Sequence, residues 1–440
     1  MAETVCVSAW LRLLEITDTR NLGDFCDISV TAIIQVSEII LAIVLLLPCA
    51  VLFLEVALAF LSRHQKSNKL SEPLDDRYKR VILMPAHNEA LVIGTALSTV
   101  QSQMWPTDRL VVVADNCTDS TAAIAQKAGA TVIFRHNEQQ RGKGYALDFG
   151  LQYLCQDPPD VVIMVDADCR VQPGAIDAIS HTVQKTNSPV QATYLLEQGE
   201  NPSPKEMIST FAFKVKNLVR PLGMHRLGYP CLLTGSGMAF PWSIIQKMNL
   251  ANDNIVEDMK LGLDLAIDGH VPTMCSDGIV IGKQPKQSAA AIVQRTRWEH
   301  GHLKILFSSV PRLLWEGLQQ RRLDLVALAL DVSIPPLALL VTLWTIISVS
   351  ETGLTLFTGG SWLPPVIVYG AGLNLMLAIS LAWYGFSRSE IPARKLLYIP
   401  LYVLWKVPLY FKFLLSPENK WVRTEREPSE PVGESSQTIV

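Results

Sequence analysis

A long apolar run near the start of the chain constrains its fold more than any other feature. Residues Val30 to Leu61 contain only Glu38 and Glu55 as charged side chains. The run is longer than the ~20 residues that a helix needs to cross a bilayer. The sequence therefore predicts a transmembrane helix over 30–61. The run is not typical of a signal peptide, because the residues before it are acidic and no cleavage site of small residues follows it.

The charges on either side of this run predict its orientation. The segment 1–29 is acidic, whereas the linker 62–79 contains Arg63, Lys66 and Lys69. Because basic flanks stay on the cytoplasmic side of a membrane, we expect 1–29 to be an extracytoplasmic segment. The domain that follows the linker is then expected to be cytoplasmic.

More apolar runs occur in the last third of the chain. They predict transmembrane helices at 323–350 and 362–387, preceded by an interfacial helix at 301–322. The segment 396–416 is apolar but contains lysines and prolines, so it is an interfacial helix or a fourth membrane helix. A charged fraction of only 18% agrees with a membrane protein. We expect a multi-pass protein of a bacterial inner (plasma) membrane, with a disordered cytoplasmic tail at 417–440.

Three acidic residues lie within or near these apolar segments: Glu38, Glu55 and Asp331. Ionisable residues at such depth are either functional or paired between helices, and the sequence leaves both interpretations open. The net charge of −3 shows no basic excess, so we expect no nucleic-acid partner.

The region 80–300 alternates short apolar runs with helical patterns. Apolar runs such as "RVILMPA", "RLVVVAD", "ATVIFRH" and "DVVIMVD" predict strands, and helical spacing lies between them. Alternation of this kind predicts an α/β domain in which a mostly parallel sheet has helices on both faces. In such sheets the ligand site lies at the carboxyl ends of the strands.

Each of these strands ends in polar residues. They are His87, Asn88 and Glu89 after the first, Asp115, Asn116 and Cys117 after the second, His136 and Asn137 after the third, and Asp166 and Asp168 after the fourth. Because the ends of parallel strands meet at one edge of a sheet, we expect these side chains to form one site. The Asp166-x-Asp168 pair can share a hard divalent cation, Mg²⁺ or Mn²⁺, that bridges the phosphates of a nucleotide diphosphate.

The usual phosphate-binding glycine motifs are missing from the sequence. Neither G-x-G-x-x-G after the first strand nor G-x-x-x-x-G-K-[ST] occurs. The nearest substitute is "QQRGKGYAL", in which Gly142 and Gly144 flank Lys143 at a helix start. This turn either contacts a phosphate or a sugar, or is a basic entry turn of the helix.

Several motifs follow one another in a recognisable order. They are "PAHNE" (Pro85 to Glu89), "ADNCTDST" with Asp115, "DAD" with Asp166 and Asp168, "VEDMKLGLDLAIDG" with Glu257 and Asp258, and "QRTRW" (Gln294 to Trp298). This combination resembles the membrane-embedded, inverting family 2 glycosyltransferases of the Q-x-x-R-W type, the group that includes cellulose, chitin and hyaluronan synthases. The resemblance implies a GT-A-like domain at 80–300, flanked by membrane helices.

The resemblance also implies roles for individual residues. Donor binding would fall to Pro85, Glu89, Asp115, Lys143, Asp166, Gln294 and Arg297, and metal binding to Asp168. Asp258 would be the general base, with Glu257 beside it in the catalytic pair. Acceptor contacts would come from Trp298, Thr234, Gly235, Ser236 and Gly237.

The chemistry of sugar transfer is compatible with these roles. An acceptor hydroxyl must lose a proton as it attacks the anomeric carbon, so a carboxylate has to act as base. The leaving diphosphate gains negative charge, which a divalent cation and an arginine offset. A single displacement inverts the anomeric carbon, so an α-linked donor would yield a β-linked product.

We therefore expect transfer from a nucleotide sugar, a UDP-sugar by the resemblance, to a glycan acceptor, which would form a β-linked polysaccharide at the bilayer. One alternative is non-processive glycosylation of a membrane lipid such as diacylglycerol or a polyprenol carrier. A transporter with an inert nucleotide-binding domain is an alternative from another class, although such proteins show more spans and repeated halves. A nucleotidyltransferase with a related sheet is a further alternative.

Overall fold

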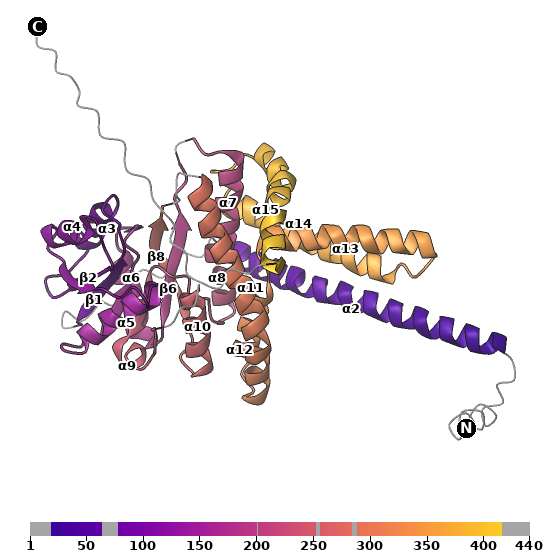
Figure 1. Ribbon diagram of the computed structural model, residues 1–440, viewed down its shortest axis with the longest axis horizontal. Coiled ribbons are helices and arrows are strands. Elements are labelled where there is room, and N and C mark those ends of the chain that lie inside the picture. Colours follow the sequence, from indigo (N-terminus) through magenta and orange to yellow (C-terminus); the bar gives the residue numbers. More distant parts are fainter. Residues whose placement is uncertain (1–18, 64–77, 200, 252–255, 284–287, 416–440) are drawn as a thin grey trace, which may run out of the picture.

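The computed structural model describes residues 19–63, 78–199, 201–251, 256–283 and 288–415. An α/β domain lies at one end, and the long helices α2 (Thr19–Ser62), α13 (Leu337–Thr358) and α14 (Leu363–Phe386) extend away from it (Figure 1). The predicted tail 417–440 and most of the predicted segment 1–29 lie outside the described residues.

The described strands form one eight-stranded sheet in the order β3-β2-β1-β4-β7-β6-β8-β5. Their bounds are β1 Arg80–Ala86, β2 Arg109–Asp115, β3 Thr131–Arg135, β4 Val161–Met164, β5 Cys169–Val171, β6 Val190–Leu196, β7 Met238–Pro241 and β8 Thr273–Gly282. The pairs among β1 to β4 are parallel, as is β6 with β8, whereas β7 pairs antiparallel with both β4 and β6. The predicted mostly parallel sheet is confirmed.

Alternate residues of β1 face opposite sides of the sheet, as the pleat of a strand requires. Ile82 packs in a core with α3 (Ile93–Gln101), α4 (Thr121–Lys127) and α6 (Ala175–Thr186). Leu83 packs in a second core with α5 (Lys143–Leu154), α9 (Trp242–Ile245) and α10 (Glu257–Ile267). Helices on both faces, as predicted, therefore bury both sides of the central strands.

Between the sheet and the long helices lie two bent helical segments. The first runs without a break through α7 (Pro204–Lys214), the π-helical turn η1 (Val215–Val219) and α8 (Arg220–Arg226). The second is α11 (Ser288–Gln319), which is one continuous helix. The predicted domain boundary at 300 falls within α11, because the helix that contains "QRTRW" continues through the segment predicted as a separate interfacial helix.

Four described segments are long and apolar enough to cross a membrane: Ile33–Ser62, Leu337–Thr358, Leu363–Phe386 and Ala393–Leu415. The last contains the 3₁₀ helix η2 (Ala393–Tyr398) and α15 (Ile399–Leu415). The predicted single span 323–350 is wrong. α12 (Leu323–Ser333) ends before Pro335 and Pro336, because a proline restricts the preceding residue and lacks the amide N–H that would continue a helix.

Candidate active site

Two adjoining cavities lie at the carboxyl ends of the strands. The sheet-edge cavity, of about 580 Å³, is lined by the turns after β1, β2 and β4 and by the start of α5. The bundle cavity, of about 260 Å³, extends from the sheet edge to the long helices. Both cavities are lined by Lys143, Asp166, Asp168, Gln294 and Arg297. The two cavities therefore meet at these five side chains, and a molecule that filled both would pass beside them.

The predicted donor-binding residues gather around the sheet-edge cavity. Pro85, Glu89 and Asp115 line it, together with the five shared residues. The backbone N–H of Glu89 donates to Thr121 Oγ1 at 2.7 Å, which fixes the turn after β1 against α4. Most of the polar residues at the predicted strand ends therefore lie around one cavity.

Asp115 is held by an ion pair that the sequence did not reveal. Arg135 Nη1 donates to Asp115 Oδ1 at 2.6 Å, and each side chain is 8% exposed. Arg135 ends β3, which pairs with β2 in parallel register. A buried carboxylate that is paired in this way is positioned rigidly at the cavity wall.

Three side chains at the end of β4 lie close enough together to hold a metal ion. The ligand atoms of Asp166, Asp168 and Cys169 are all within 4.8 Å of one another. Burial is the main cause that raises the pKa of the Cys169 thiol, which keeps it protonated. Two carboxylates suit a hard cation such as Mg²⁺ or Mn²⁺, whereas a protonated thiol does not. Asp166 and Asp168 therefore fit the predicted cation.

Lys143 forms an ion pair with Asp166, and its ammonium donates to the carbonyl of Gly235 at 2.6 Å. Burial alone would lower the pKa of Lys143, but Asp166, Glu257 and Asp258 raise it above the ordinary value. Lys143 is thus a fixed positive charge where the two cavities meet.

The predicted catalytic pair lies in the first turn of α10. Asp258 Oδ1 accepts a hydrogen bond from the N–H of Met259 at 2.8 Å. A carboxylate at a helix N-terminus is stabilised by the helix dipole. Burial, and then the charge of Asp258, raise the pKa of the neighbouring Glu257 to about 7. Both side chains line the bundle cavity.

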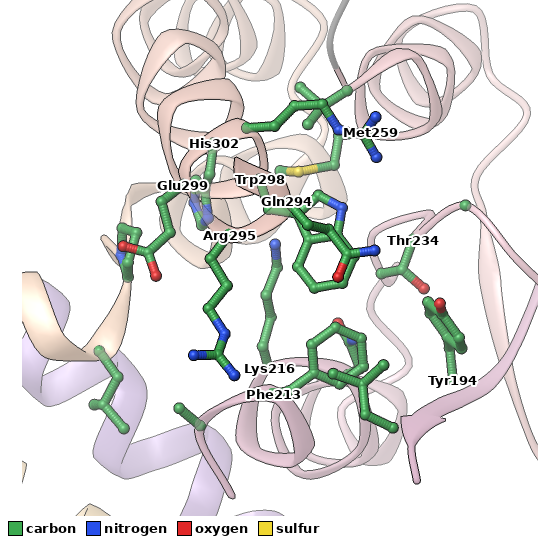
Figure 2. A pocket seen from close by; sticks show the side chains of 18 of the residues that line it. Tyr194, Phe213, Lys216, Thr234, Met259, Gln294, Arg295, Trp298, Glu299 and His302 are labelled. Atoms are coloured by element: carbon green, nitrogen blue, oxygen red, sulfur yellow. The ribbon is translucent and has the colours of Figure 1, made fainter. Parts of the chain in front are cut away.

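An aromatic series crosses the bundle cavity. The rings of Trp298 and Phe213 are 5.6 Å apart, and those of Phe213 and Tyr194 are 5.4 Å apart. Figure 2 shows Trp298 and Gln294 above Phe213, with Tyr194 and Thr234 to the right. Asp168, Asp258 and Trp298 all line this cavity, as the predicted site requires.

The predicted acceptor segment divides into two pairs. Thr234 and Gly235 line the bundle cavity, whereas Ser236 and Gly237 line neither cavity. Ser236 is fully buried, and its Oγ accepts the N–H of Asp166 at 3.1 Å. Contact of Ser236 and Gly237 with an acceptor is therefore a wrong prediction. The chain turns inward here to start β7, so these two residues support the turn that contains Asp166 and Asp168 instead.

Several residues of the bundle cavity belong to no motif. Phe213 and Lys216 come from α7 and η1, Arg220 from α8, and Lys406 from α15. The basic residues have no distinctive spacing in the sequence, so no pattern could have found them. The π-helical turn η1 coincides with this wall, and such turns often occur at functional sites.

A family model described as glycosyltransferase like family 2 matches residues 80–301. The chain belongs to glycosyltransferase family 2. The matched region contains both carboxylate pairs and the "QRTRW" segment.

The chain matches parts of several bacterial proteins. It is 32% identical over 133 residues to a 4,4'-diaponeurosporenoate glycosyltransferase of Staphylococcus aureus (strain MRSA252), covering 29% of this chain and 34% of the relative. It is 25% identical over 261 residues to the probable glycosyltransferase YdaM of Bacillus subtilis (strain 168), covering 53% of this chain and 57% of that relative. The chain therefore spans only about a third to somewhat over half of these relatives.

Among solved structures, the chain resembles the mannosyltransferase PcManGT from Pyrobaculum calidifontis, a complex with GDP-Man and Mn²⁺. The TM-score is 0.52 at 16% identity, over 86% of this chain and 100% of that one. At this identity the likeness shows the fold alone, which is GT-A-like with additional helices.

Proposed function

We propose that this chain is an inverting glycosyltransferase that moves a sugar from a nucleotide-diphosphate donor, a UDP-sugar by its motifs, to an acceptor at the membrane. The observation that carries the proposal is that Asp168, Asp258 and Trp298 line one cavity, which shares a wall with the sheet-edge cavity. The nucleoside would occupy the sheet-edge cavity, beside Pro85, Glu89 and Asp115.

The residues at the junction suit a diphosphate leaving group. Arg297 Nε is buried and has no hydrogen-bond partner among the described residues, and a guanidinium matches a phosphate in shape and charge. Lys143 supplies a second positive charge. Asp166 and Asp168 would hold a divalent cation, which offsets the charge of the leaving diphosphate. The donor complex of the mannosyltransferase neighbour with Mn²⁺ supports this assignment.

Asp258 would act as the base. It accepts the proton of the acceptor hydroxyl as the acceptor oxygen bonds to the anomeric carbon. The bond from that carbon to the diphosphate breaks, and its electron pair leaves with the nucleotide. Attack from the face opposite the leaving group inverts the anomeric carbon, and Trp298 would present a flat apolar surface to the acceptor sugar.

The position of the bundle cavity favours an acceptor with an apolar part. Leu52, Leu337 and Tyr402, from three of the four candidate membrane segments, line its far end. An apolar chain in the bilayer could therefore present its head group to Asp258. The name of the Staphylococcus aureus relative, a diaponeurosporenoate glycosyltransferase, is in keeping with such an acceptor.

A growing β-linked polysaccharide is the second candidate acceptor. Gln294, Arg297 and Trp298 match the Q-x-x-R-W pattern, and all three line the bundle cavity. Recovery of the labelled product in a lipid extract would favour the lipid acceptor, whereas recovery in an insoluble polymer would favour the polysaccharide.

We also propose that the active site faces the cytoplasm, because the linker after α2 is basic. Cys155 is exposed on the α/β domain. In a variant with Cys6 and Cys26 replaced by serine, a membrane-impermeant maleimide should label Cys155 in inverted vesicles only. Labelling of intact cells at Cys155 would contradict this orientation.

The experiment is a transfer assay with purified protein in lipid, several labelled nucleotide sugars and Mn²⁺. Asp258→Asn should lower transfer by about 10²–10⁴-fold, the range for loss of a general base, while donor binding by calorimetry is unchanged. Asp264→Asn, on the same helix but outside both cavities, is the matched control and should remain active. Full activity of Asp258→Asn would remove Asp258 from the role of base.

A further inference from the structure

The wall of the bundle cavity changes character along its length. Tyr194 Oη lies 3.8 Å from the sulfur of Cys169, at the metal-binding turn, so this end of the aromatic series is next to the carboxylates. Phe213 contacts Tyr194 and is the next ring in the series, and Trp298 contacts Phe213. The cavity therefore runs from carboxylates to aromatic rings.

Beyond the aromatic rings the wall is basic. Lys216 lies three residues after Phe213, and Arg295 lies three residues before Trp298. Each basic residue is therefore about one helical turn from its aromatic neighbour. The guanidinium carbon of Arg295 is 6.0 Å from the ring centre of Trp405 on α15. Figure 2 shows the same order, with Lys216 and Arg295 between the aromatic rings and Glu299.

Most other charges at this end of the cavity are neutralised. Arg220 pairs with Glu55 and Asp331, and Lys406 pairs with Glu299. Lys216, by contrast, has no hydrogen bond or ion pair within the described parts of the chain, although it is partly buried. Burial lowers the pKa of Lys216, and the Arg220 charge adds to that effect against the opposing charge of Asp258.

A cation that forms no ion pair inside a cavity is costly unless the ligand supplies an anion. A neutral glycan or diacylglycerol would supply none. Lys216 with Arg295 can contact the oxygens of a phosphate, which accept charge-assisted hydrogen bonds from both side chains. The apolar residues Leu52, Leu337 and Tyr402 lie at the far end, toward the candidate membrane segments.

We infer that the acceptor is a lipid-linked sugar phosphate, with its sugar between Asp258 and Trp298, its phosphate at Lys216 and Arg295, and its apolar chain directed toward α2, α13 and α15. The inference rests on the proposed function and specifies its acceptor. A sugar hydroxyl remains the attacking group, so the proton still passes to Asp258.

The test uses three synthetic acceptors with the nucleotide sugar that the wild-type protein turns over best. They are glucosyl farnesyl phosphate, the neutral farnesyl glucoside and farnesyl phosphate without a sugar. The phosphate-linked glucoside should have a KM at least about tenfold below that of the neutral glucoside, since a charged hydrogen bond has this effect on binding. Farnesyl phosphate alone should not be glycosylated.

Variants then assign this preference to the basic wall. Lys216→Gln should raise the KM for the phosphate-linked glucoside about tenfold, with the KM for the donor and the rate on the neutral glucoside unchanged. Lys216→Arg should restore the preference. Lys260→Gln, on α10 and outside both cavities, is the control and should leave every constant unchanged.

Equal use of the charged and neutral glucosides, transfer to farnesyl phosphate itself, or an unaltered KM in Lys216→Gln would each overturn the inference. So would turnover of the donor onto host membrane lipids with no transfer to the phosphate-linked glucoside. If no nucleotide sugar is turned over with any acceptor, the proposed function itself fails, which is a separate result.

Discussion

Gly235 connects the acceptor segment to the proposed base. Its φ of +95° lies in the region that favours glycine. A Cβ at this position would lie 2.9 Å from Asp258 Oδ2, closer than real Cβ contacts occur. The carbonyl of Gly235 also accepts a hydrogen bond from the Lys143 ammonium. A glycine at this position lets the backbone approach both the Asp258 carboxylate and the Lys143 ammonium.

Gly235→Ala should therefore displace the Asp258 carboxylate. We expect kcat to fall by about 10²-fold, the effect of misplacing a reacting group by roughly 1 Å. Gly129→Ala is the matched control, because Gly129 has a φ of +83° and open space around it. Both variants should lose about 1 kcal/mol of stability, but only Gly235→Ala should lose activity in the transfer assay. Equal loss of activity in both would refute a local effect on Asp258.

The raised pKa of Glu257 predicts a pH-dependent stability. Its carboxyl, with a folded-state pKa of about 7, binds a proton more tightly than it does in the unfolded chain. The stability that this proton provides is therefore fully present below the unfolded pKa and is lost as pH rises to 7, by roughly 3 kcal/mol at most. Thermal unfolding of the metal- and donor-free protein between pH 4 and pH 8 measures this loss. Glu257→Gln should flatten the profile, and an unchanged slope would contradict the assignment.

At the residue level, the sequence predicted groups that belong to motifs and missed those that do not. Asp168, Asp258 and Trp298 were predicted from motifs and share a cavity. Ser236 was predicted to line the acceptor site but is fully buried, because sequence spacing does not show which way a loop turns. Lys216 was missed because a single lysine in a helical pattern is normally a solvated residue.

Among the elements, α8 packs against the first long helix, α2. A Cβ at Gly223 would lie only 2.1 Å from the backbone oxygen of Glu55 on α2, so the two helices pack with no space for a side chain. Beside this contact, Arg220 donates to Glu55 Oε2 at 3.0 Å and to Asp331 Oδ1 at 2.5 Å. Glu55 and Asp331, two of the three acidic residues noted in the sequence, are thus partners in an interhelical network.

Arg220→Met should leave both carboxylates buried without their cation. Breaking a buried ion pair on one side costs about 3–5 kcal/mol, so the thermal midpoint in detergent should fall markedly. A triple variant with Glu55→Leu, Arg220→Met and Asp331→Leu should recover most of that loss, because no unpaired charge remains. A triple variant less stable than Arg220→Met would contradict this account of the network.

Element types were easier to predict than their connections. The strands β1, β2 and β4 agree with three of the apolar runs, because buried parallel strands are continuously hydrophobic, and the remaining run coincides with the edge strand β3. The antiparallel β7 was not predicted, because "MAFP" is too short to show a period. The break between α12 and α13 has a visible signal, Pro335 next to Pro336, which the hydropathy of the surrounding run concealed.

At the scale of the whole molecule, the bundle cavity joins the α/β domain to the candidate membrane segments. Asp258 lies at its sheet end, and Leu337 and Tyr402 at its helix end. These residues are far apart in the sequence and come together through the packing of α11 and α12 against α10 and of α13 and α15 against α7. No local pattern records that packing, so the sequence predicted both parts of the molecule but not the cavity between them.

The central claim is that a metal-bound nucleotide sugar lies across the junction of the two cavities, with its anomeric carbon toward Asp258. The most direct measurement is a structure of the protein in lipid with Mn²⁺ and a non-hydrolysable nucleotide sugar. The account predicts Mn²⁺ on Asp166 and Asp168, the nucleoside beside Asp115, and the sugar between Asp258 and Trp298. A nucleotide bound elsewhere, or a sugar directed away from Asp258, would contradict it.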